Sequence, residues 1–305
     1  MKRVFLFLAT NVAVLAVLSV VFQVFGVEQW LYREGAGINV QGLLIFSALF
    51  GMGGAFISLA MSKWLAKRGM GVRVIEQPAS DGERWLVQAV ERIAREAGIG
   101  TPEVGIFPSN APNAFATGMS RDDALVAVSA GLLRNLPKNE VEAVLGHELS
   151  HVANGDMVTL GLIQGVVNTF VIFLARIVGL VVDRALFRDE RGMGVGYFLT
   201  TMVAQIFLSI LASMIVMAFS RWREYRADAG GARLAGPQNM IGALQSLQRL
   251  HDPSPLPGEL AAFGISGGIP AGLSRLFMSH PPLEQRIAAL QQQYDVRAGE
   301  LRHDH

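Results

Sequence analysis

Apolar residues are concentrated in four long runs along this chain, with mixed polar and apolar segments between and after them. The runs cover residues 4–25, 38–61, 157–182 and 195–219. Each is long enough to cross a lipid bilayer as a helix, which takes about 20 residues. Together the four runs contain a single charged residue, Arg176, near the end of the third run. The pattern predicts an α-helical membrane protein that crosses the bilayer several times.

The third and fourth runs also fit a second interpretation, a buried or interfacial helical hairpin. Gln164, Asn168, Arg176 and Gln205 interrupt their apolar surface, and polar side chains inside a bilayer are unfavourable. The first run is longer than the apolar core of a secretory signal peptide, and no small-residue cleavage site follows it. We therefore expect the first run to remain as a membrane anchor.

Basic residues mark particular ends of these runs. Lys and Arg precede the first run and follow the second and the fourth, whereas the first connection has only Arg33. Because such residues favour the cytoplasmic side, these flanks are expected to be cytoplasmic. The third connection weakens this rule, since it contains Arg184, Arg188 and Arg191 interleaved with acidic residues.

The composition excludes some classes of binding partner and some kinds of metal site. Charged residues make up 17% of the 305 residues, below the usual quarter or so of a soluble protein. A net charge of +1 gives no field that favours nucleic acid, so no nucleic-acid partner is expected. Without cysteine there is neither a disulfide framework nor a thiolate metal site, and any metal must be held by nitrogen and oxygen atoms.

The mixed segments predict a compact α+β part followed by helices. Between the second and third runs, strands are expected at 72–76 and 104–107, a helix at 82–97, a hairpin of strands 114–117 and 124–129 joined by 118–123, and a helix at 138–154. After the fourth run, helices are expected at 222–235, 237–250 and 283–294. The segment 252–272 is rich in Pro and Gly, which fits either a flap or a simple linker.

These segments divide the chain into five parts. They are a two-helix anchor (1–68), an α+β part (69–156), the third and fourth apolar helices (157–220), a second helical part (221–295) and a charged tail (296–305).

The sequence HELSH, residues 147–151, is the strongest chemical signal. Positions one and five of this motif lie one turn apart on a helix, so His147 and His151 can bind one zinc ion. Glu148 then lies beside the metal, where a carboxylate can take a proton from an activated water. A surface helix with two unrelated histidines is the alternative, and the amphipathic context of residues 138–154 argues against it.

A third ligand must come from elsewhere in the chain. Glu224 is the best candidate, with Asp228 one turn further along the same helix face, where it can accept the second N–H of a ligand histidine. The alternative is a solvated helix beside the membrane whose acidic residues pair with Arg. His280 precedes two prolines, a position that fits either a turn residue or a functional one.

In combination, these motifs resemble the HtpX family of membrane zinc metalloproteases, which is related to the CaaX prenyl-protein endopeptidases. The resemblance runs to about Tyr294 and rests on HELSH with the following NGD, NAFATG at 113–118, REYRAD at 223–228 and SHPPL at 279–283. It implies an α-helical membrane protein with a cytoplasmic, zincin-like α+β metalloprotease domain, mostly helical with a small sheet.

The resemblance also assigns roles to residues. His147, His151 and Glu224 would bind one Zn²⁺ per chain, and Glu148 would be the base. His280 would help to hold the substrate or the developing oxyanion. The substrate would lie along Asn113, Ala114, Phe115, Ala116 and Thr117.

The function implied is that of a zinc-dependent endopeptidase in protein quality control. It would lie in the bacterial cytoplasmic membrane, face the cytoplasm and cleave misfolded or damaged membrane proteins. A membrane chaperone or scaffold with a structural zinc site is the alternative, but such a site normally has four protein ligands and needs no glutamate base.

Overall fold

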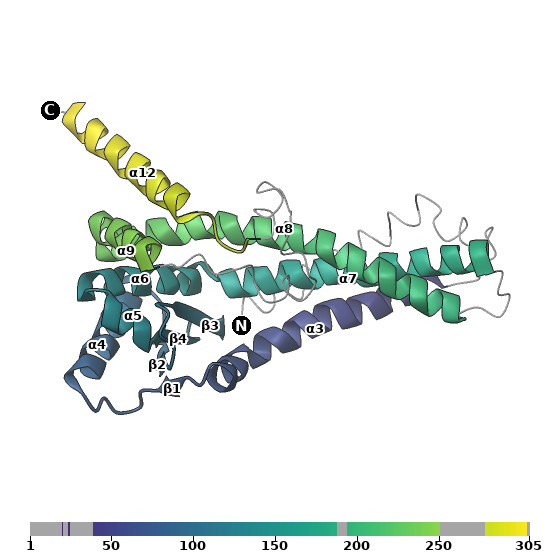
Figure 1. Cartoon of the computed structure of the whole chain (residues 1–305), viewed down its shortest axis with the longest axis horizontal. Coiled ribbons are helices and arrows are strands. Elements are labelled where there is room, and N and C mark those ends of the chain that lie inside the picture. The colour runs from purple at the N-terminus through teal and green to yellow at the C-terminus, as the bar shows by residue number, and fades with distance from the viewer. Residues whose placement is uncertain (1–19, 21–23, 25–38, 188–193, 251–277, 304–305) are drawn as a thin grey trace. The chain divides into compact units, whose positions relative to one another are not determined.

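The computed structural model describes residues 20, 24, 39–187, 194–250 and 278–303 of the chain, with side chains up to residue 295 (Figure 1). The first predicted run, apart from Val20 and Val24, and the Pro/Gly-rich segment 252–272 lie outside the described residues. The chain divides into two compact units. An apolar unit comprises Met1–Leu59 and Val158–Val216, and a sheet unit comprises Ala60–Met157 and Met217–His305.

The second, third and fourth apolar runs form long helices. They are α3 (Val40–Gly69), α7 (Asp156–Val182) and α8 (Val195–Ala235). By length and composition, three helices of the described chain can cross a membrane, and they correspond to these elements. Large apolar side chains such as Phe198, Val203 and Phe207 are more than half exposed on α8. Such a surface is typical of a helix that faces lipid.

Small residues bring these helices together inside the apolar unit. A Cβ atom at Gly51 of α3 would lie 2.5 Å from the backbone nitrogen of Thr169 in α7. One at Gly179 of α7 would lie 2.0 Å from the hydroxyl of Thr201 in α8. Because glycine lets two backbones approach closely, helices can pack well without a hydrophobic driving force between them.

The sheet unit contains a mixed sheet of four strands in the order β1-β2-β4-β3. The strands are β1 (Arg73–Val74), β2 (Glu103–Phe107), β3 (Ala114–Ser120) and β4 (Asp123–Ser129). β2 and β4 are parallel, whereas β1–β2 and β3–β4 are antiparallel. The predicted hairpin is confirmed, but its strands are longer than expected. A register shift between Gly118 and Ser120 lets β3 continue to a tight turn.

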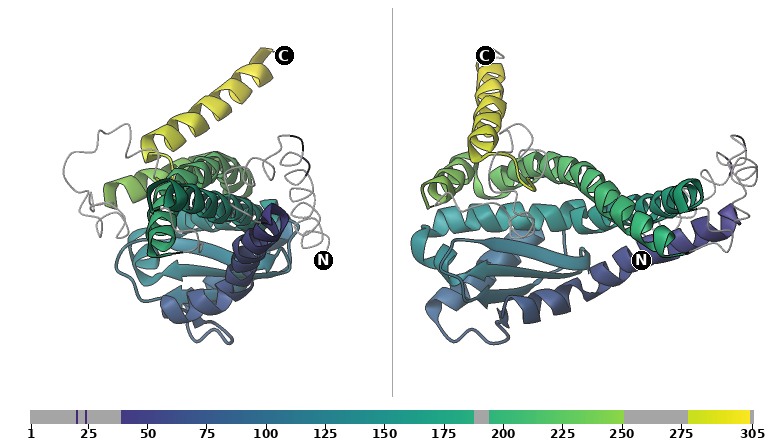
Figure 2. Two further views of the ribbon diagram at one scale, coloured as in Figure 1. Left: turned by 90° about the vertical axis from the view of Figure 1, so that its right-hand side faces the viewer. Right: turned by 45° about the vertical axis from the view of Figure 1, so that its right-hand side comes forward.

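Within the described residues, five further α-helices surround the sheet or follow it in the sequence. They are α4 (Asp81–Glu96), α5 (Ala130–Asn135), α6 (Lys138–Asn154), α9 (Pro237–Leu250) and α12 (Leu283–His303). Leu86 and Ile93 of α4, Val126 of β4, and Leu145 and Leu149 of α6 are fully buried in one core. The right-hand view in Figure 2 shows α6 lying along the sheet. The core therefore fixes α6, the helix that carries HELSH.

Two helix boundaries differ from the sequence prediction. The helix expected at 222–235 is the end of α8, which continues without a break from Val195. Neither Gly nor Pro lies between residues 219 and 222 to interrupt it. At the other end, α12 runs past residue 294 to His303, into the segment expected to be a charged tail.

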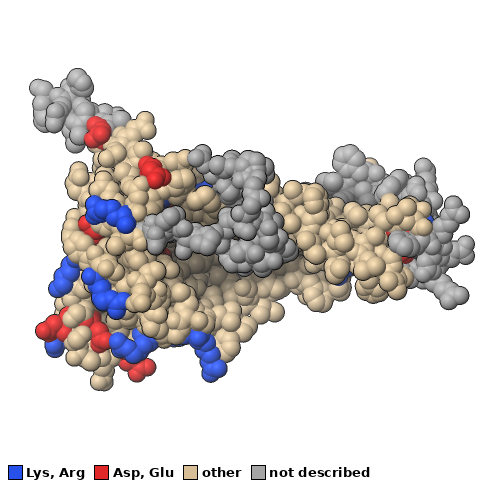
Figure 3. All heavy atoms as spheres, viewed as in Figure 1, with Lys and Arg blue, Asp and Glu red and all other residues tan. Residues whose placement is uncertain are grey.

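Charged side chains are distributed unequally between the two units. On the face drawn in Figure 3, Lys, Arg, Asp and Glu gather over the sheet unit. One cluster fixes the end of α3 within this unit, where Lys63 contacts Asp123 and lies 2.8 Å from Glu103, and Lys67 also contacts Glu103. This cluster holds the last turns of α3 against β2 and β4.

Candidate metal centre

Helix α6 places His147 and His151 one turn apart on its buried face. The helix ends at Gly155, whose φ of 71° is left-handed, a conformation that glycine adopts without strain. Helix α7 begins at the next residue, Asp156. The carboxylate of Asp156 lies against the His151 ring.

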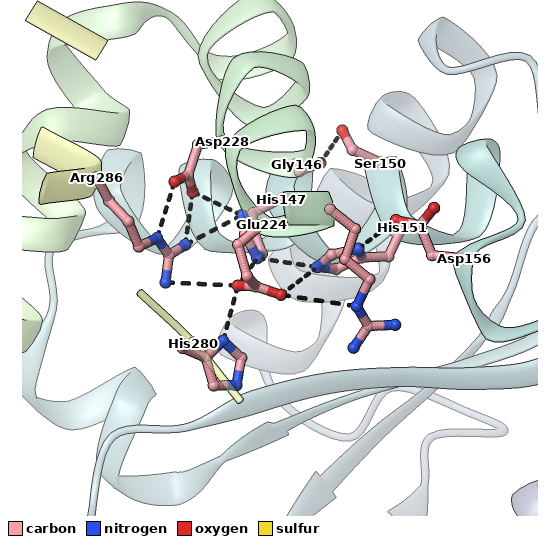
Figure 4. Close-up of polar contacts among 10 residues, drawn as sticks. Gly146, His147, Ser150, His151, Asp156, Glu224, Asp228, His280 and Arg286 are labelled. Carbon is pink, nitrogen blue, oxygen red and sulfur yellow. Dashed lines mark hydrogen bonds and ion pairs between the residues drawn. The ribbon is translucent and has the colours of Figure 1, made fainter. Parts of the chain in front are cut away.

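Glu224 of α8 completes a compact group of three potential ligands (Figure 4). The two histidine Nε2 atoms lie 3.2 Å apart. Glu224 Oε2 lies 3.4 Å from the Nε2 of His147, and Oε1 lies 3.3 Å from the Nε2 of His151. The Glu224 side chain is completely buried. The structure thus brings together the three residues that the sequence singled out as ligands.

Glycines at the crossing of α6 and α8 permit this close approach. A Cβ atom at Gly231 would lie 3.0 Å from the backbone nitrogen of His147, and one at Gly230 would lie 2.2 Å from the hydroxyl of Ser150. Gly146 of α6 faces Gly231 from the other side. Larger residues at this crossing would push Glu224 away from the histidines.

Carboxylates hold the outer nitrogens of both histidine rings. The Nδ1 of His147 lies 2.9 Å from Asp228, and the Nδ1 of His151 lies 2.7 Å from Asp156. An ionised carboxylate only accepts hydrogen bonds, so each Nδ1 carries a proton and donates it. In the neutral rings, each Nε2 then presents a lone pair towards Glu224.

The group fits a zinc ion. Tetrahedral coordination with bonds of about 2.0–2.1 Å places ligand atoms roughly 3.3 Å apart. The two Nε2 atoms are 3.2 Å apart, and each lies 3.3–3.4 Å from a different oxygen of Glu224. A cation between these atoms would offset the repulsion of their lone pairs. Glu224 Oε1 also has no hydrogen-bond partner within the described chain, although it is buried. Three protein ligands would leave the fourth position for water.

The same electrostatic environment affects both histidines. Burial alone lowers the pKa of His147, but the carboxylates of Asp228 and Glu224 outweigh burial and raise this pKa to about 9. Burial also lowers the pKa of His151, but the carboxylates of Asp156 and Glu224 outweigh burial and raise this pKa above its usual value. The group thus favours a positive charge, whether a proton or a metal ion. Metal binding at neutral pH should therefore release a proton.

Arg286 of α12 forms the outer wall of the site. Its buried guanidinium binds Asp228 with two hydrogen bonds, from Nε at 2.8 Å and from Nη2 at 2.5 Å. Its Nη1 lies 3.6 Å from Glu224 Oε2. A bidentate pair of this kind fixes the carboxylate plane. Arg286 therefore sets the position of the oxygen that accepts from His147.

His280 lies at the same site, and Glu148 is the residue after His147 on α6. Glu148 is half-buried on α6, and no hydrogen bond or ion pair joins it to another described residue. The Nδ1 of His280 lies 2.7 Å from Glu224 Oε2, and 59% of its side chain is exposed. His280 thus contacts the third candidate ligand, and the roles expected for both residues stay predictions.

The segment expected to contact substrate begins at Asn113 and continues into β3. Ala114, Phe115, Ala116 and Thr117 pair with β4 along one side of β3, and no other described strand pairs along its opposite side. The backbone of Asn113 is fixed by Ser129, whose hydroxyl accepts from Asn113 at 2.9 Å. β3 also packs against α6, which carries the histidines. The geometry is compatible with the predicted contact.

Two residues of the site escaped the sequence analysis. Asp156 was noted only as part of a motif, although an acidic residue directly after a helix-ending glycine could have indicated its bond to His151. Arg286 gave no local signal, because its partner Asp228 is 58 residues away in the sequence.

Comparisons with known proteins agree with this geometry. Residues 80–294 match Peptidase family M48. Protease HtpX of Thioalkalivibrio sulfidiphilus (strain HL-EbGR7) is 64% identical over 290 residues, covering 95% of this chain and 98% of that protein. The Protease HtpX homolog of Thiobacillus denitrificans (strain ATCC 25259 / T1) is 62% identical, covering 95% and 99%. The predicted family is confirmed.

A solved structure resembles the fold. The crystal structure of S. mikatae Ste24p matches with a TM-score of 0.60 and 19% identity, covering 92% of this chain and 65% of that one. The predicted class of a mostly helical membrane protein with a small sheet is confirmed.

Gly230→Ala should disrupt the metal centre. The added methyl group would clash with Ser150, destabilise the crossing by about 1–3 kcal/mol and separate Glu224 from the histidines. Zinc content after purification should fall, and a second change, Ser150→Gly, should restore part of it. Gly82→Ala is the control, since its Cβ would meet nothing closer than 3.9 Å. Full zinc content in Gly230→Ala would contradict the role given to this crossing.

Asp156→Asn should weaken zinc binding while preserving the shape of the side chain. The amide lacks the charge that supports His151 as a ligand, so zinc affinity should fall by about 10–100-fold. Competition with a fluorescent chelator measures this change. Asp81→Asn, at an exposed helix start, should leave the affinity unchanged. Wild-type affinity in Asp156→Asn would show that the contact with His151 has no influence on the metal.

Proposed function

The chain belongs to Peptidase family M48 and is a membrane zinc metallopeptidase, and from this membership we propose that it is an endopeptidase with one zinc ion held by His147, His151 and Glu224. The observation that carries this proposal is the buried group of His147, His151 and Glu224, in which each residue offers one ligand atom within 4.8 Å of the others. Glu148 follows His147 directly on the same helix. A site built only for stability would normally be closed by four protein ligands. That difference disfavours the alternative of a chaperone or scaffold.

Glu148 is the proposed base. A zinc ion bound at this site would lower the pKa of a water molecule and polarise the substrate carbonyl. As the water oxygen bonds to the carbonyl carbon, Glu148 takes a proton from the water. It then passes this proton to the peptide nitrogen while the carbon–nitrogen bond breaks. The second proton of the attacking water follows to the same nitrogen, which yields a carboxylate and a protonated amine.

The outer residues keep the ligands in position. Asp228, fixed by Arg286, orients His147, and Asp156 orients His151. Such partners fix the tautomer of a ligand histidine and raise its basicity. They also keep both imidazoles neutral when the metal is bound, because the proton stays on Nδ1.

The open side of β3 is the proposed binding site for an extended substrate. Main-chain pairing with residues 113–117 recognises the backbone more than the side chains, which suits a broad range of sequences. His280 is mostly exposed beside Glu224 and would help to hold the substrate or its developing oxyanion. Asn113, at the start of this segment, is exposed as well.

The proposed substrates are misfolded or damaged membrane proteins, cleaved at the cytoplasmic face of the bacterial inner membrane. Support comes from the chain itself. α7, a helix long enough to span, begins at Asp156, five residues after His151, and Glu224 lies on α8. A site attached so closely to membrane helices suits substrates that are themselves in the membrane. The partners would be such proteins and the bilayer, in a role of protein quality control.

Glu148→Gln should retain zinc and lose at least about 10²-fold in rate. The measurement is cleavage of casein, an unfolded test protein, by purified enzyme with zinc and with a chelator. Glu142→Gln is a matched control on the same helix, where Glu142 pairs with Arg92 at 2.7 Å, and it should cleave normally. Wild-type cleavage by Glu148→Gln, or cleavage that the chelator leaves intact, would overturn the proposed chemistry.

The absence of cysteine makes the orientation testable with one introduced thiol. Arg121→Cys lies at the exposed turn between β3 and β4. If this face is cytoplasmic, a membrane-impermeant maleimide should label it in inverted vesicles and leave it unlabelled in spheroplasts. The reverse pattern would place the site on the opposite side of the membrane.

A further inference from the structure

Arg223, the residue before Glu224 on α8, has a buried nitrogen without a hydrogen-bond partner. Its Nε lies 4.0 Å from Glu224 Oε1, beyond hydrogen-bond distance, and no other described residue accepts from it. The side chain as a whole is 17% exposed. The guanidinium is therefore at the metal site and reaches solvent, but one of its donors is unused.

Arg286, the second arginine of the site, has hydrogen-bond acceptors for its guanidinium. Arg286 binds Asp228 with two hydrogen bonds, and its place is explained by that carboxylate. Among the described residues, Arg223 has no carboxylate within hydrogen-bond distance, only the 4.0 Å ion pair with Glu224. A buried charged donor without an acceptor is unfavourable, so a position of this kind usually has a functional explanation.

The nearest carboxylate does not satisfy this donor. Glu224 Oε1 lies 4.0 Å from Arg223 Nε, within the range of an ion pair but too far for a hydrogen bond. The two oxygens of Glu224 face other groups, since Oε1 lies 3.3 Å from the Nε2 of His151 and Oε2 is the acceptor for His280. The hydrogen of Arg223 Nε therefore has no acceptor among the described residues.

The missing acceptor should therefore arrive with the substrate. The carbonyl oxygen of the scissile bond gains negative charge as water attacks, and donors fixed in advance at that point lower the barrier. We infer that Arg223 donates a hydrogen bond to this carbonyl oxygen and stabilises the charge that develops on it. This inference rests on the proposed function, and it assigns to Arg223 a role that neither the HELSH helix nor the outer carboxylates perform.

Arg223→Gln and Arg223→Met test the inference, with Arg226→Gln as control. Arg226 is exposed on the same helix, stacked 5.0 Å from the ring of Trp222, and its variant should behave as wild type. In both Arg223 variants kcat should fall by about 10²–10³-fold with little change in KM. Affinity for a phosphoramidate peptide, a tetrahedral anionic mimic of the attacked carbonyl, should fall by a similar factor.

Two further readouts separate this role from a structural one. Zinc content should match the wild type. The Tm of the zinc-free protein should be unchanged or higher, because the variants remove a buried donor that has no acceptor among the described residues and lose only the 4.0 Å contact with Glu224. Loss of zinc, a lower Tm or a change confined to KM would overturn the inference, as would an unchanged kcat.

The assay also distinguishes this inference from the proposed function. Wild type and Glu148→Gln are measured on the same casein substrate. If the wild type shows no zinc-dependent cleavage, the proposed function fails and this inference fails with it. If the wild type cleaves and Arg223→Gln cleaves equally well, the role of Arg223 alone is wrong.

Discussion

The crossing of α6 and α8 is the contact on which the rest of this site depends. At Gly146, Gly230 and Gly231 the two backbones approach too closely for ordinary side chains, and this brings two imidazoles and a carboxylate within 3.4 Å of one another. Three electron-rich atoms in a buried position repel each other. A cation at this position would offset the repulsion, so the packing of two helices and the proposed affinity for a metal depend on the same contact.

Segments that are distant in the sequence contribute to this arrangement. Asp156 stands where α7 begins, directly after the turn at Gly155, and Arg286 belongs to α12. Both act through an intermediate group, Asp156 on a histidine and Arg286 on Asp228. Because these groups meet only in the folded chain, metal binding should stabilise the folded state as a whole.

The parts of the structure that could be predicted from sequence are those with local causes. His147, Glu148 and His151 follow from helical spacing, and the bounds of α6 and α9 follow from caps and periodicity. Glu224 was found because cysteine is absent and an acidic pair lies one turn apart. The parallel pairing of β2 with β4, the contact of Arg286 and the continuity of α8 escaped prediction, because long-range packing determines the first two and a weak boundary signal the third.

The side of β3 along which no described strand pairs has a second consequence, which concerns self-recognition. An edge that binds extended peptides, as proposed, would also match the same edge on another copy of the chain, and exposed edges of this kind promote aggregation. The irregularity between Gly118 and Ser120 interrupts the regular ladder, and Arg121 and Asp122 carry exposed charges just beyond it. An irregular strand with a charged end pairs poorly with the same strand of a second copy of the chain. The same residues would also limit the length of a substrate segment that can pair with β3.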